Sequence, residues 1–279
     1  MRFCKMNGAG NDFLIINNLE ENLPHELFPT IAQTLCHRHL SIGADGLMVV
    51  ERSSVDADFR MLFFNADGSA GEMCGNGARC ICRYGYESGL SGERQVVETP
   101  SGIVTGQRID KRNYRIRLTD PSVIKLSYPV EACGETWECS YIELGTPGLP
   151  HAVVSIKNLK EKSFDELREL GRTLRYHSAF PKGANVNFYD IDASDELTLR
   201  TYERGVEDFT YACGTGTGST VLALTLMGKV SGREVVVKNP GGLLRVSIDR
   251  TDECIENLWL TGPTNIVCAG EILDEDLSF

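Results

Sequence analysis

The stretch Glu72-Met73-Cys74-Gly75-Asn76-Gly77 decides the fold, because it has a counterpart in Tyr211-Ala212-Cys213-Gly214-Thr215-Gly216. The two cysteines lie 139 positions apart, and two other pairs of segments keep nearly the same offset. These pairs are Phe13-Leu14-Ile15-Ile16 with Ala152-Val153-Val154-Ser155, and Val97-Glu98-Thr99-Pro100-Ser101-Gly102 with Val237-Lys238-Asn239-Pro240-Gly241-Gly242. One offset shared by several segments predicts two similar domains, each with one Cys-Gly-x-Gly turn. We expect them to cover residues 1–120 and 121–279, with a return of the last strand to the N-terminal domain left open.

Each Cys-Gly-x-Gly turn is expected to begin a helix. The predicted helices cover residues 76–88 and 215–226. Each is followed by a glycine, Gly89 or Gly228, which is the residue type favoured just after a helix C-terminus. The second helix contains more glycine than helix propensity favours, and we expect close packing of its backbone to explain this.

The remaining segments predict strands, hairpins and one amphipathic helix. Ser163, followed three positions later by Glu166, forms a capping box that opens a helix over residues 163–174. Alternating or β-branched patterns predict strands at residues 114–118, 235–238 and 243–248. The predicted hairpin turns are Pro100-Ser101-Gly102 and Pro240-Gly241-Gly242.

Composition and charge exclude several classes of function. The chain has 279 residues, of which 42% are hydrophobic and 24% charged, as in ordinary globular proteins. A net charge of -11 argues against nucleic-acid binding and against coating of an anionic membrane. No apolar run approaches the ~20 residues of a membrane span, and the N-terminus lacks the apolar stretch of a secretory signal. We therefore expect a cytoplasmic location, where the ten cysteines stay reduced.

A cysteine at a helix N-terminus faces unpaired backbone N–H groups and the positive end of the helix dipole. This position favours a thiolate, and the same N–H groups bind carboxylates. Two such turns could hold one small anion with a sulfur on either side. Donors directed at an α-carboxylate stabilise the charge that develops when the α-proton leaves. One thiolate then takes the proton and the opposite thiol returns one, which inverts the carbon and needs no metal or organic cofactor.

The residues also allow two alternatives to a two-thiol active site, namely a metal site and a nucleotide site. Cys74, Cys80 and Cys82 cluster, but the spacing of a structural zinc site is missing, and Cys36-His37-Arg38-His39 resembles a ligand set only superficially. We expect Cys80 and Cys82 to be packing residues. The other cysteines expected to be structural are Cys133, Cys139, Cys254 and Cys268. The glycine-rich stretch at residues 214–218 lacks the Gly-Lys-Ser/Thr of a phosphate loop.

Taken together, the motifs resemble those of the diaminopimelate epimerase family nearly from end to end. The most specific blocks are Phe64-Asn65-Ala66-Asp67-Gly68-Ser69 before the first cysteine turn and Tyr202-Glu203-Arg204-Gly205 before the second. Further blocks are Asn7-Gly8-Ala9-Gly10-Asn11-Asp12-Phe13, Ile42-Gly43-Ala44-Asp45-Gly46-Leu47, Pro150-His151-Ala152-Val153 and Asn185-Val186-Asn187-Phe188. The resemblance implies an α+β fold of two pseudo-symmetric domains, each a β-barrel-like sheet around a central helix, with the active site in the interdomain cleft.

The resemblance also implies roles for particular residues. Cys74 and Cys213 are the implied acid/base pair. The residues implied to read the rest of the amino-acid substrate are Asn11, Asn65, Asn185, Glu203 and Arg204. Those implied to hold the reacting carboxylate are Gly75, Asn76, Gly214 and Thr215. A guanidinium fork suits a distant carboxylate, whereas a glutamate and amide carbonyls suit an ammonium. Glu203 and Arg204 could instead form a solvated surface pair.

One departure from the family pattern leaves the substrate open. Leu149 stands before Pro150 and His151 where many members have asparagine. His151 could contact substrate or be structural. The alternatives to an epimerase of LL- and meso-diaminopimelate are a racemase of another amino acid, such as histidine, on the same scaffold, and a non-catalytic thiol protein that binds metal or senses redox state. A homodimer is a family-level expectation only.

Overall fold

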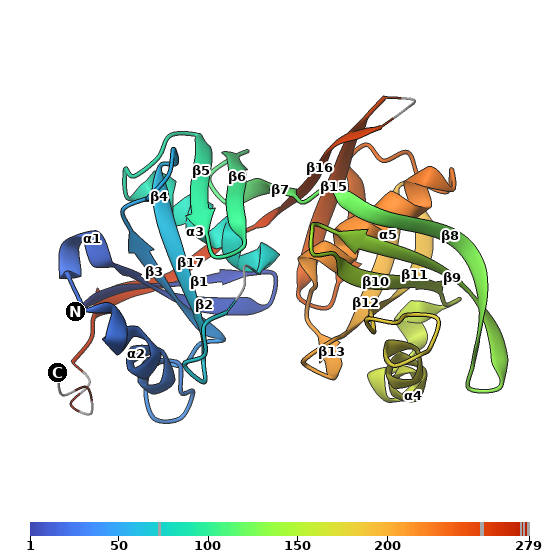
Figure 1. Ribbon diagram of the computed structural model, residues 1–279, viewed down its shortest axis with the longest axis horizontal. Helices are drawn as coiled ribbons and strands as arrows, with labels where there is room; N and C mark the ends of the chain where they lie inside the picture. Colours follow the sequence, from blue (N-terminus) through green and yellow to red (C-terminus); the bar gives the residue numbers. More distant parts are fainter. Residues whose placement is uncertain (72–73, 252–253, 274, 276, 278–279) are drawn as a thin grey trace. The chain divides into compact units, whose positions relative to one another are not determined.

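The computed structural model describes residues 1–71, 74–251, 254–273, 275 and 277. Glu72 and Met73, which begin the first repeated motif, lie outside the described residues. The chain divides into two compact units, Met1–Ile116 with Gly262–Phe279, and Arg117–Thr261 (Figure 1). Each unit is a β-sheet with helices packed on it. No helix within the described ranges is both long and apolar enough for a membrane crossing.

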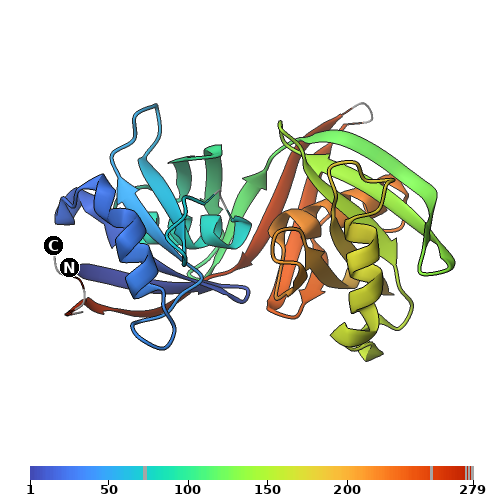
Figure 2. The same cartoon turned by 60° about the horizontal axis from the view of Figure 1, so that its bottom comes forward.

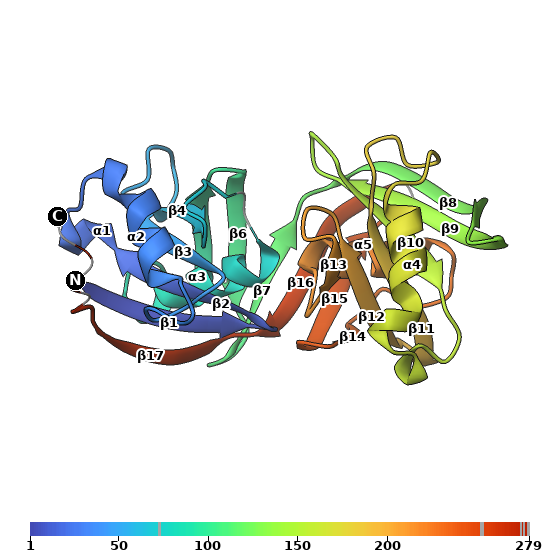
Figure 3. The same ribbon diagram turned by 90° about the horizontal axis from the view of Figure 1, so that it is seen from below.

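The described residues of the first unit form eight strands, the last of which comes from the C-terminal part of the chain. Its elements are β1 (Arg2–Gly8), β2 (Asn11–Asn17), α1 (Asn18–Glu21), η1 (His25–Leu27), α2 (Phe28–Leu35), β3 (Gly46–Glu51), β4 (Phe59–Asn65), α3 (Gly75–Glu87), β5 (Arg94–Thr99), β6 (Gly102–Arg108), β7 (Asn113–Leu118) and β17 (Asn265–Glu271). The strands pair in the order β17-β1-β2-β3-β4-β5-β6-β7. Figure 3 shows β17 running beside β1.

The second unit repeats this topology. Its elements are β8 (Pro121–Ala132), β9 (Glu135–Leu144), β10 (Leu149–Ser155), η2 (Leu159–Glu161), α4 (Phe164–Arg175), β11 (Asn185–Ala193), β12 (Glu196–Glu203), β13 (Asp208–Thr210), α5 (Gly214–Leu226), β14 (Val235–Asn239), β15 (Gly242–Arg250) and β16 (Ile255–Pro263). The strands pair in the order β8-β9-β10-β11-β12-β14-β15-β16, and β13 also pairs with β12. In both units the third and fifth pairings are parallel and the rest antiparallel. The sequence repeat is therefore also a repeat of strand order and direction.

Helices fill the parallel connections because parallel neighbours need a crossover. In the first unit α2 connects β2 to β3, and α3 connects β4 to β5. In the second unit α4 connects β10 to β11, and α5 lies in the connection from β12 to β14 (Figure 2). The helix that begins after each cysteine, α3 or α5, therefore lies in the equivalent connection of its own sheet.

The middle of strand β2 is apolar and buried because helices pack on both faces of the sheet there. Leu14 and Ile16 of β2 pack in a cluster with residues of α2. Phe13 points the other way, toward Gly77 of α3. In the second unit, Val154 of β10 packs in a cluster with residues of α4. This two-sided burial explains why residues 13–16 form an uninterrupted apolar run.

The predicted secondary structure is largely confirmed. The helices predicted at 76–88 and 215–226 are α3 and α5, and the glycines that follow them have positive φ angles of 71° and 69°. The capping box of Ser163 and Glu166 opens α4. Both predicted hairpin turns connect paired antiparallel strands, β5 to β6 and β14 to β15.

The prediction for the structural cysteines is wrong at three of four positions. Cys139 is buried, but Cys133, Cys254 and Cys268 are exposed. Cys133 occupies the tight turn between β8 and β9, with a φ of 53°, and Cys268 lies on the exposed strand β17. Turns and exposed strands leave a side chain in solvent whatever its hydrophobicity. Cys80 and Cys82 are fully buried in α3, as predicted.

Candidate active site

The first candidate half-site lies at the N-terminus of α3. Cys74 is the N-cap residue, with extended backbone angles (φ -95°, ψ 130°), and its carbonyl accepts a hydrogen bond from Ala78 N at 2.8 Å. Gly75, Asn76 and Gly77 form the buried first turn. The cysteine therefore stands at the end of the helix where backbone N–H groups lack intrahelical acceptors.

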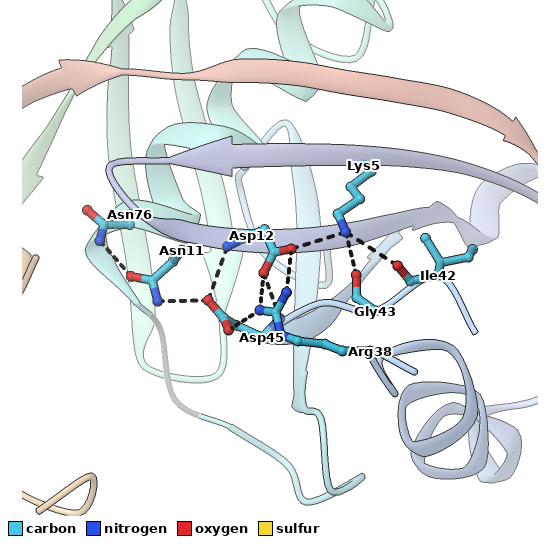
Figure 4. A network of polar contacts seen from close by, with 8 residues as sticks. All are labelled: Lys5, Asn11, Asp12, Arg38, Ile42, Gly43, Asp45 and Asn76. Atoms are coloured by element: carbon cyan, nitrogen blue, oxygen red, sulfur yellow. Dashed lines mark hydrogen bonds and ion pairs between the residues drawn. The ribbon is translucent and has the colours of Figure 1, made fainter. Parts of the chain in front are cut away.

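Asn76 is tied to Asn11, a residue 65 positions earlier in the chain. The Asn76 side-chain amide donates to Asn11 Oδ1 at 2.8 Å, and the Arg79 guanidinium donates to Asn76 Oδ1 at 2.7 Å. Asn11 Nδ2 donates in turn to Asp45 Oδ2 at 3.0 Å (Figure 4). Two predicted site residues, Asn11 and Asn76, are thus brought into direct contact.

Asn65, the third predicted amide of this unit, is not part of that chain of contacts in the described residues. It ends β4, is exposed, and donates from Nδ2 to Ser69 Oγ at 2.9 Å. Its own carbonyl accepts from Gly68 N at 2.9 Å. These bonds hold Asn65 in the turn that leads toward Cys74.

The second candidate half-site lies at the N-terminus of α5. Cys213 is the N-cap residue (φ -106°, ψ 112°) and is 8% exposed. Its sulfur accepts a hydrogen bond from Gly216 N at 3.4 Å and lies 3.5 Å from Thr215 Oγ1. This sulfur therefore touches the first turn of its helix through both a backbone donor and a side-chain hydroxyl, while Gly214 begins the helix.

The Asn185 side chain is joined to the main chain of Arg204. Asn185 Oδ1 accepts from Arg204 N at 2.8 Å, and its Nδ2 donates to Pro150 O at 3.2 Å. The exposed Arg204 guanidinium donates to Lys182 O at 3.1 Å and makes no ion pair within the described part of the chain. A guanidinium without a carboxylate partner can receive one from a ligand.

Glu203 does not pair with its neighbour Arg204 in the described contacts. Its Oε2 accepts from Thr210 Oγ1 at 2.9 Å. Burial raises the pKa of Glu203 above its ordinary value, and the hydrogen bond from Thr210 opposes this only in part. The half-buried carboxyl and the exposed guanidinium therefore have different surroundings.

His151, for which the sequence left open a substrate contact or a structural role, forms a buried pair with Asn187, which the sequence did not mark as a site residue. Asn187 Nδ2 lies 3.3 Å from His151 Nδ1 and donates to Ala152 O, and its Oδ1 accepts from Thr201 Oγ1. Burial, reinforced by the charge of Arg204, lowers the pKa of His151 to about 3. The ring is therefore neutral at pH 7, and its Nε2 has no hydrogen-bond partner among the described residues.

Leu149 begins β10 opposite Leu144 of β9 and is partly buried. It brings a hydrocarbon side chain beside Pro150, whose carbonyl accepts from Asn185. The departure from the family pattern therefore lies one residue from the amide contacts of the second half-site.

The described ranges contain no group of three His, Cys, Asp or Glu side chains placed to hold a metal ion. Burial raises the pKa values of Cys80 and Cys82 to about 12, so both thiols stay protonated inside α3. Cys80 and Cys82 are therefore packed residues of the core.

The fold is shared with known racemases and epimerases. A probable proline racemase from Agrobacterium radiobacter K84 superposes with a TM-score of 0.67 at 17% identity, covering 99% of this chain and 94% of that one. A hydroxyproline epimerase from Agrobacterium vitis superposes with a TM-score of 0.68, also at 17% identity and with the same coverage. The fold is thus the α+β arrangement of two pseudo-symmetric domains predicted from the sequence. Closure of each sheet into a barrel stays a prediction.

Sequence similarity defines the family more narrowly. The family model for diaminopimelate epimerase matches residues 3–123 and 145–267. A diaminopimelate epimerase from Chlorobaculum tepidum is 38% identical over 272 residues, covering 96% of this chain and 99% of that protein. One from Aquifex aeolicus is 35% identical over 288 residues and covers both chains completely. The chain belongs to the diaminopimelate epimerase family.

Proposed function

We propose that this protein is an isomerase that interconverts LL- and meso-2,6-diaminopimelate, in lysine and peptidoglycan precursor biosynthesis. The observation that carries the proposal is the equivalent placement of two cysteines. Cys74 and Cys213 are both N-cap residues of buried helices. The two units have the same strand order, and these helices lie in equivalent connections of that order. Family membership and relatives 35–38% identical supply the substrate.

The proposed reaction begins with capture of the substrate's reacting carboxylate at the two helix N-termini. Gly75 and Asn76 would bind it from the first unit, and Gly214 and Thr215 from the second. Backbone N–H groups at helix ends are suited to anions. We propose that the two units are the two domains of the enzyme and that substrate lies in the cleft between them.

The proposed proton transfer uses the two sulfurs on opposite faces of the α-carbon. One cysteine, as thiolate, takes the α-proton, so that the C–H bond breaks and an S–H bond forms. The electron pair left on carbon spreads into the carboxylate, where the N–H donors stabilise it. The other cysteine, as thiol, gives its proton to the opposite face and becomes the thiolate. The product has inverted configuration and the enzyme has exchanged the roles of its two sulfurs.

The far end of the substrate carries a second carboxylate and a second ammonium group. We assign the distal carboxylate to Arg204, because its guanidinium makes no ion pair in the described contacts. Glu203 and the amides of Asn65 and Asn185 are the proposed contacts for the rest of the distal end. A cytoplasmic location and a homodimer remain predictions.

Proton NMR of LL-diaminopimelate in D₂O tests the two-base mechanism. The α-proton signal should disappear as solvent deuterium enters, and Cys74→Ala and Cys213→Ala should each reduce epimerisation by more than about a hundredfold while unfolding at wild-type temperature. Cys133→Ala removes an exposed cysteine remote from both helices in the sequence and should leave the rate unchanged. Epimerisation by either of the first two variants at the wild-type rate would refute the assignment.

A racemase of a different amino acid is the second candidate, and Leu149 is the observation that favours it. Parallel assays of diaminopimelate, histidine and glutamate separate the two candidates. We expect turnover of diaminopimelate alone. Racemisation of histidine at a higher kcat/KM would reassign the substrate while leaving the roles of the cysteines intact.

A further inference from the structure

Asp45 ends the loop before β3 and joins a polar network around Asn11 that includes Lys5, Asp12, Arg38 and Asn76 (Figure 4). We propose that Asp45 is a positioning residue that holds the Asn11 side chain as an N–H donor toward a carboxylate of the substrate. This inference rests on the proposed function, because it assigns one contact of that same site. Neither the motif resemblance nor the proposed mechanism gives Asp45 a role.

The orientation of the amides follows from the two ends of the hydrogen-bond chain. The Arg79 guanidinium can only donate, and a carboxylate such as that of Asp45 can only accept. Since Arg79 donates to Asn76 Oδ1, the Asn76 nitrogen is the donor to Asn11 Oδ1. The Asn11 nitrogen must then be the donor to Asp45 Oδ2. If the oxygen and nitrogen of either amide were exchanged, a donor would face a donor and an acceptor would face an acceptor, so these hydrogen bonds would be lost.

The carboxylate of Asp45 is itself held from three sides. Its Oδ1 accepts from Arg38 Nη2 at 2.7 Å, and its Oδ2 accepts from Asp12 N at 3.1 Å as well as from Asn11. The same Arg38 nitrogen lies 2.7 Å from Asp12 Oδ1, and Lys5 Nζ lies 3.1 Å from Asp12 Oδ2. Two cations and two carboxylates thus tie the loop that carries Asp45 to the start of β2.

The pKa of Asp12 is consistent with this arrangement. Burial alone would raise it, but hydrogen bonds from Arg38 and Lys5 hold it below its ordinary value. Asp12 therefore stays ionised and keeps Arg38 beside Asp45 at neutral pH.

Asn11 retains one N–H for a ligand. Its carbonyl oxygen accepts from Asn76, and one of its two amide hydrogens is directed to Asp45. The second amide hydrogen has no partner among the described contacts of this partly buried side chain. A donor held in this way matches a carboxylate oxygen, whereas an ammonium group needs an acceptor. Loss of Asp45 would free the amide to rotate and remove that selectivity.

The test measures steady-state kinetics of Asp45→Ala, Asp45→Asn and Asp110→Ala with diaminopimelate. We expect Asp45→Ala to raise KM about tenfold with kcat within about twofold, because a fixed hydrogen bond to a charged group is lost equally from ground and transition states. Asp45→Asn keeps an acceptor oxygen and should recover most of the loss. Among the described residues, the Asp110 side chain bonds only to its own turn at residues 112–113. Asp110→Ala therefore serves as the matched control, with unchanged KM and kcat.

Pimelate, which has both carboxylates of the substrate and neither ammonium, identifies the group that Asn11 reads. Its competitive inhibition constant should rise in Asp45→Ala by the same factor as KM. A raised KM with unchanged inhibition by pimelate would assign Asn11 to an ammonium and overturn the proposal. A fall in kcat without a change in KM would overturn it too, since the role would then lie at the reacting carbon.

Two further measurements distinguish failure of the Asp45 proposal from unfolding of the variant and from failure of the proposed function. If Asp45→Ala unfolds below the assay temperature, Arg38→Met replaces it, because Arg38 is largely exposed, and a KM raised two- to threefold is expected. Wild-type values of KM and of inhibition by pimelate in Arg38→Met and Asp45→Ala would refute the positioning role. A wild-type protein without diaminopimelate turnover would instead refute the proposed function.

Discussion

At the scale of single residues, His151 is the most strongly perturbed histidine near the second half-site. Burial lowers its pKa to about 3, whereas a histidine in an unfolded chain titrates near its ordinary value of 6.5. Between these values the unfolded chain binds a proton that the folded chain does not. Folding stability therefore falls as pH decreases below about 6.5 and continues to fall down to about pH 3.

Replacing His151 by asparagine tests this linkage. Asparagine keeps an acceptor near the Nδ1 position, so the contact with Asn187 can survive. Wild-type stability should fall by about 2 kcal/mol between pH 7 and pH 5 from this group alone, and His151→Asn should lack that part of the decrease. Urea unfolding at several pH values measures it, with the exposed His39 replaced by asparagine as control. Parallel pH profiles for His151→Asn and wild type would contradict the prediction.

At the scale of secondary structure, α5 is a helix buried on almost every side and rich in glycine. Each interior glycine costs a helix about 1 kcal/mol relative to alanine. Space explains their presence, because a Cβ on Gly216 would lie 2.2 Å from Asn187 Oδ1, and one on Gly218 would lie 2.4 Å from Leu118 Cδ1. The expectation of close backbone packing is thus confirmed, and the neighbours are core side chains of the same unit.

The two glycines should differ in their tolerance of alanine. Leu118 Cδ1 is the end of a flexible side chain, whereas Asn187 is fixed by hydrogen bonds to His151, Ala152 and Thr201. We expect Gly216→Ala to destabilise the protein by about 1–3 kcal/mol and Gly218→Ala by less. Chemical denaturation measures both.

Gly92→Ala is the matched control, since a Cβ there meets no atom within 4 Å. Its free energy of unfolding should stay within about 0.5 kcal/mol of wild type. Equal stability of Gly216→Ala and Gly92→Ala would show that the Asn187 side chain can move away from a Cβ at position 216 at little cost. The contact between Asn187 and Gly216 would then not constrain α5.

At the scale of the whole molecule, the chain's last strand completes its first unit. β17 pairs with β1 from Arg2↔Glu271 to Asn7↔Asn265, in the position that β8 takes beside β9 in the second unit. Thr264, just before β17, is bound to Arg112 O and accepts from the buried Arg83. The first unit therefore depends on residues 264–271, which are far from β1 along the chain.

A chain that stops after Pro263 should destabilise the first unit selectively. Without β17, one edge of β1 loses its hydrogen bonds and Arg83 loses its acceptor, so a fall of roughly 10 °C in the unfolding temperature of that unit is expected. Hydrogen exchange should quicken in β1 and remain slow in β10 and β11. A chain that stops after Leu273 keeps β17 and should resemble the full-length protein. Equal exchange of β1 in both truncations would contradict this dependence.

Much of the fold and the centre of the site could be predicted because the signals are local. The Cys-Gly-x-Gly turn predicts where α3 and α5 begin, and a glycine about 15 residues later predicts where each ends. The capping box of Ser163 and Glu166 predicts the start of α4. The internal repeat then predicts two equivalent units without any knowledge of strand pairing. The roles of Cys74 and Cys213 rest on this local reasoning and on family resemblance.

The surroundings of the site were not predictable in the same way. Arg79, Asp45 and Asn187 carried no signal of their own, although Asp45 and Asn187 lie inside blocks that marked the family. Asp45 contacts Asn11 across 34 positions in the chain, and the exposure of Cys133 and Cys268 follows from their places in a turn and on an exposed strand. Hydrogen-bond direction, burial and pKa arise from contacts between distant segments, which no local pattern encodes.

The sequence by itself determined the two-fold repeat, the cysteine-led helices and the family, since turn chemistry, helix caps and hydrophobic periodicity act over a few residues. Only the tertiary structure decided which amide donates to which, that His151 is neutral and buried, and that β17 completes the first unit. These properties depend on which groups folding removes from water and brings within hydrogen-bond distance, and that choice is made by the packed chain as a whole.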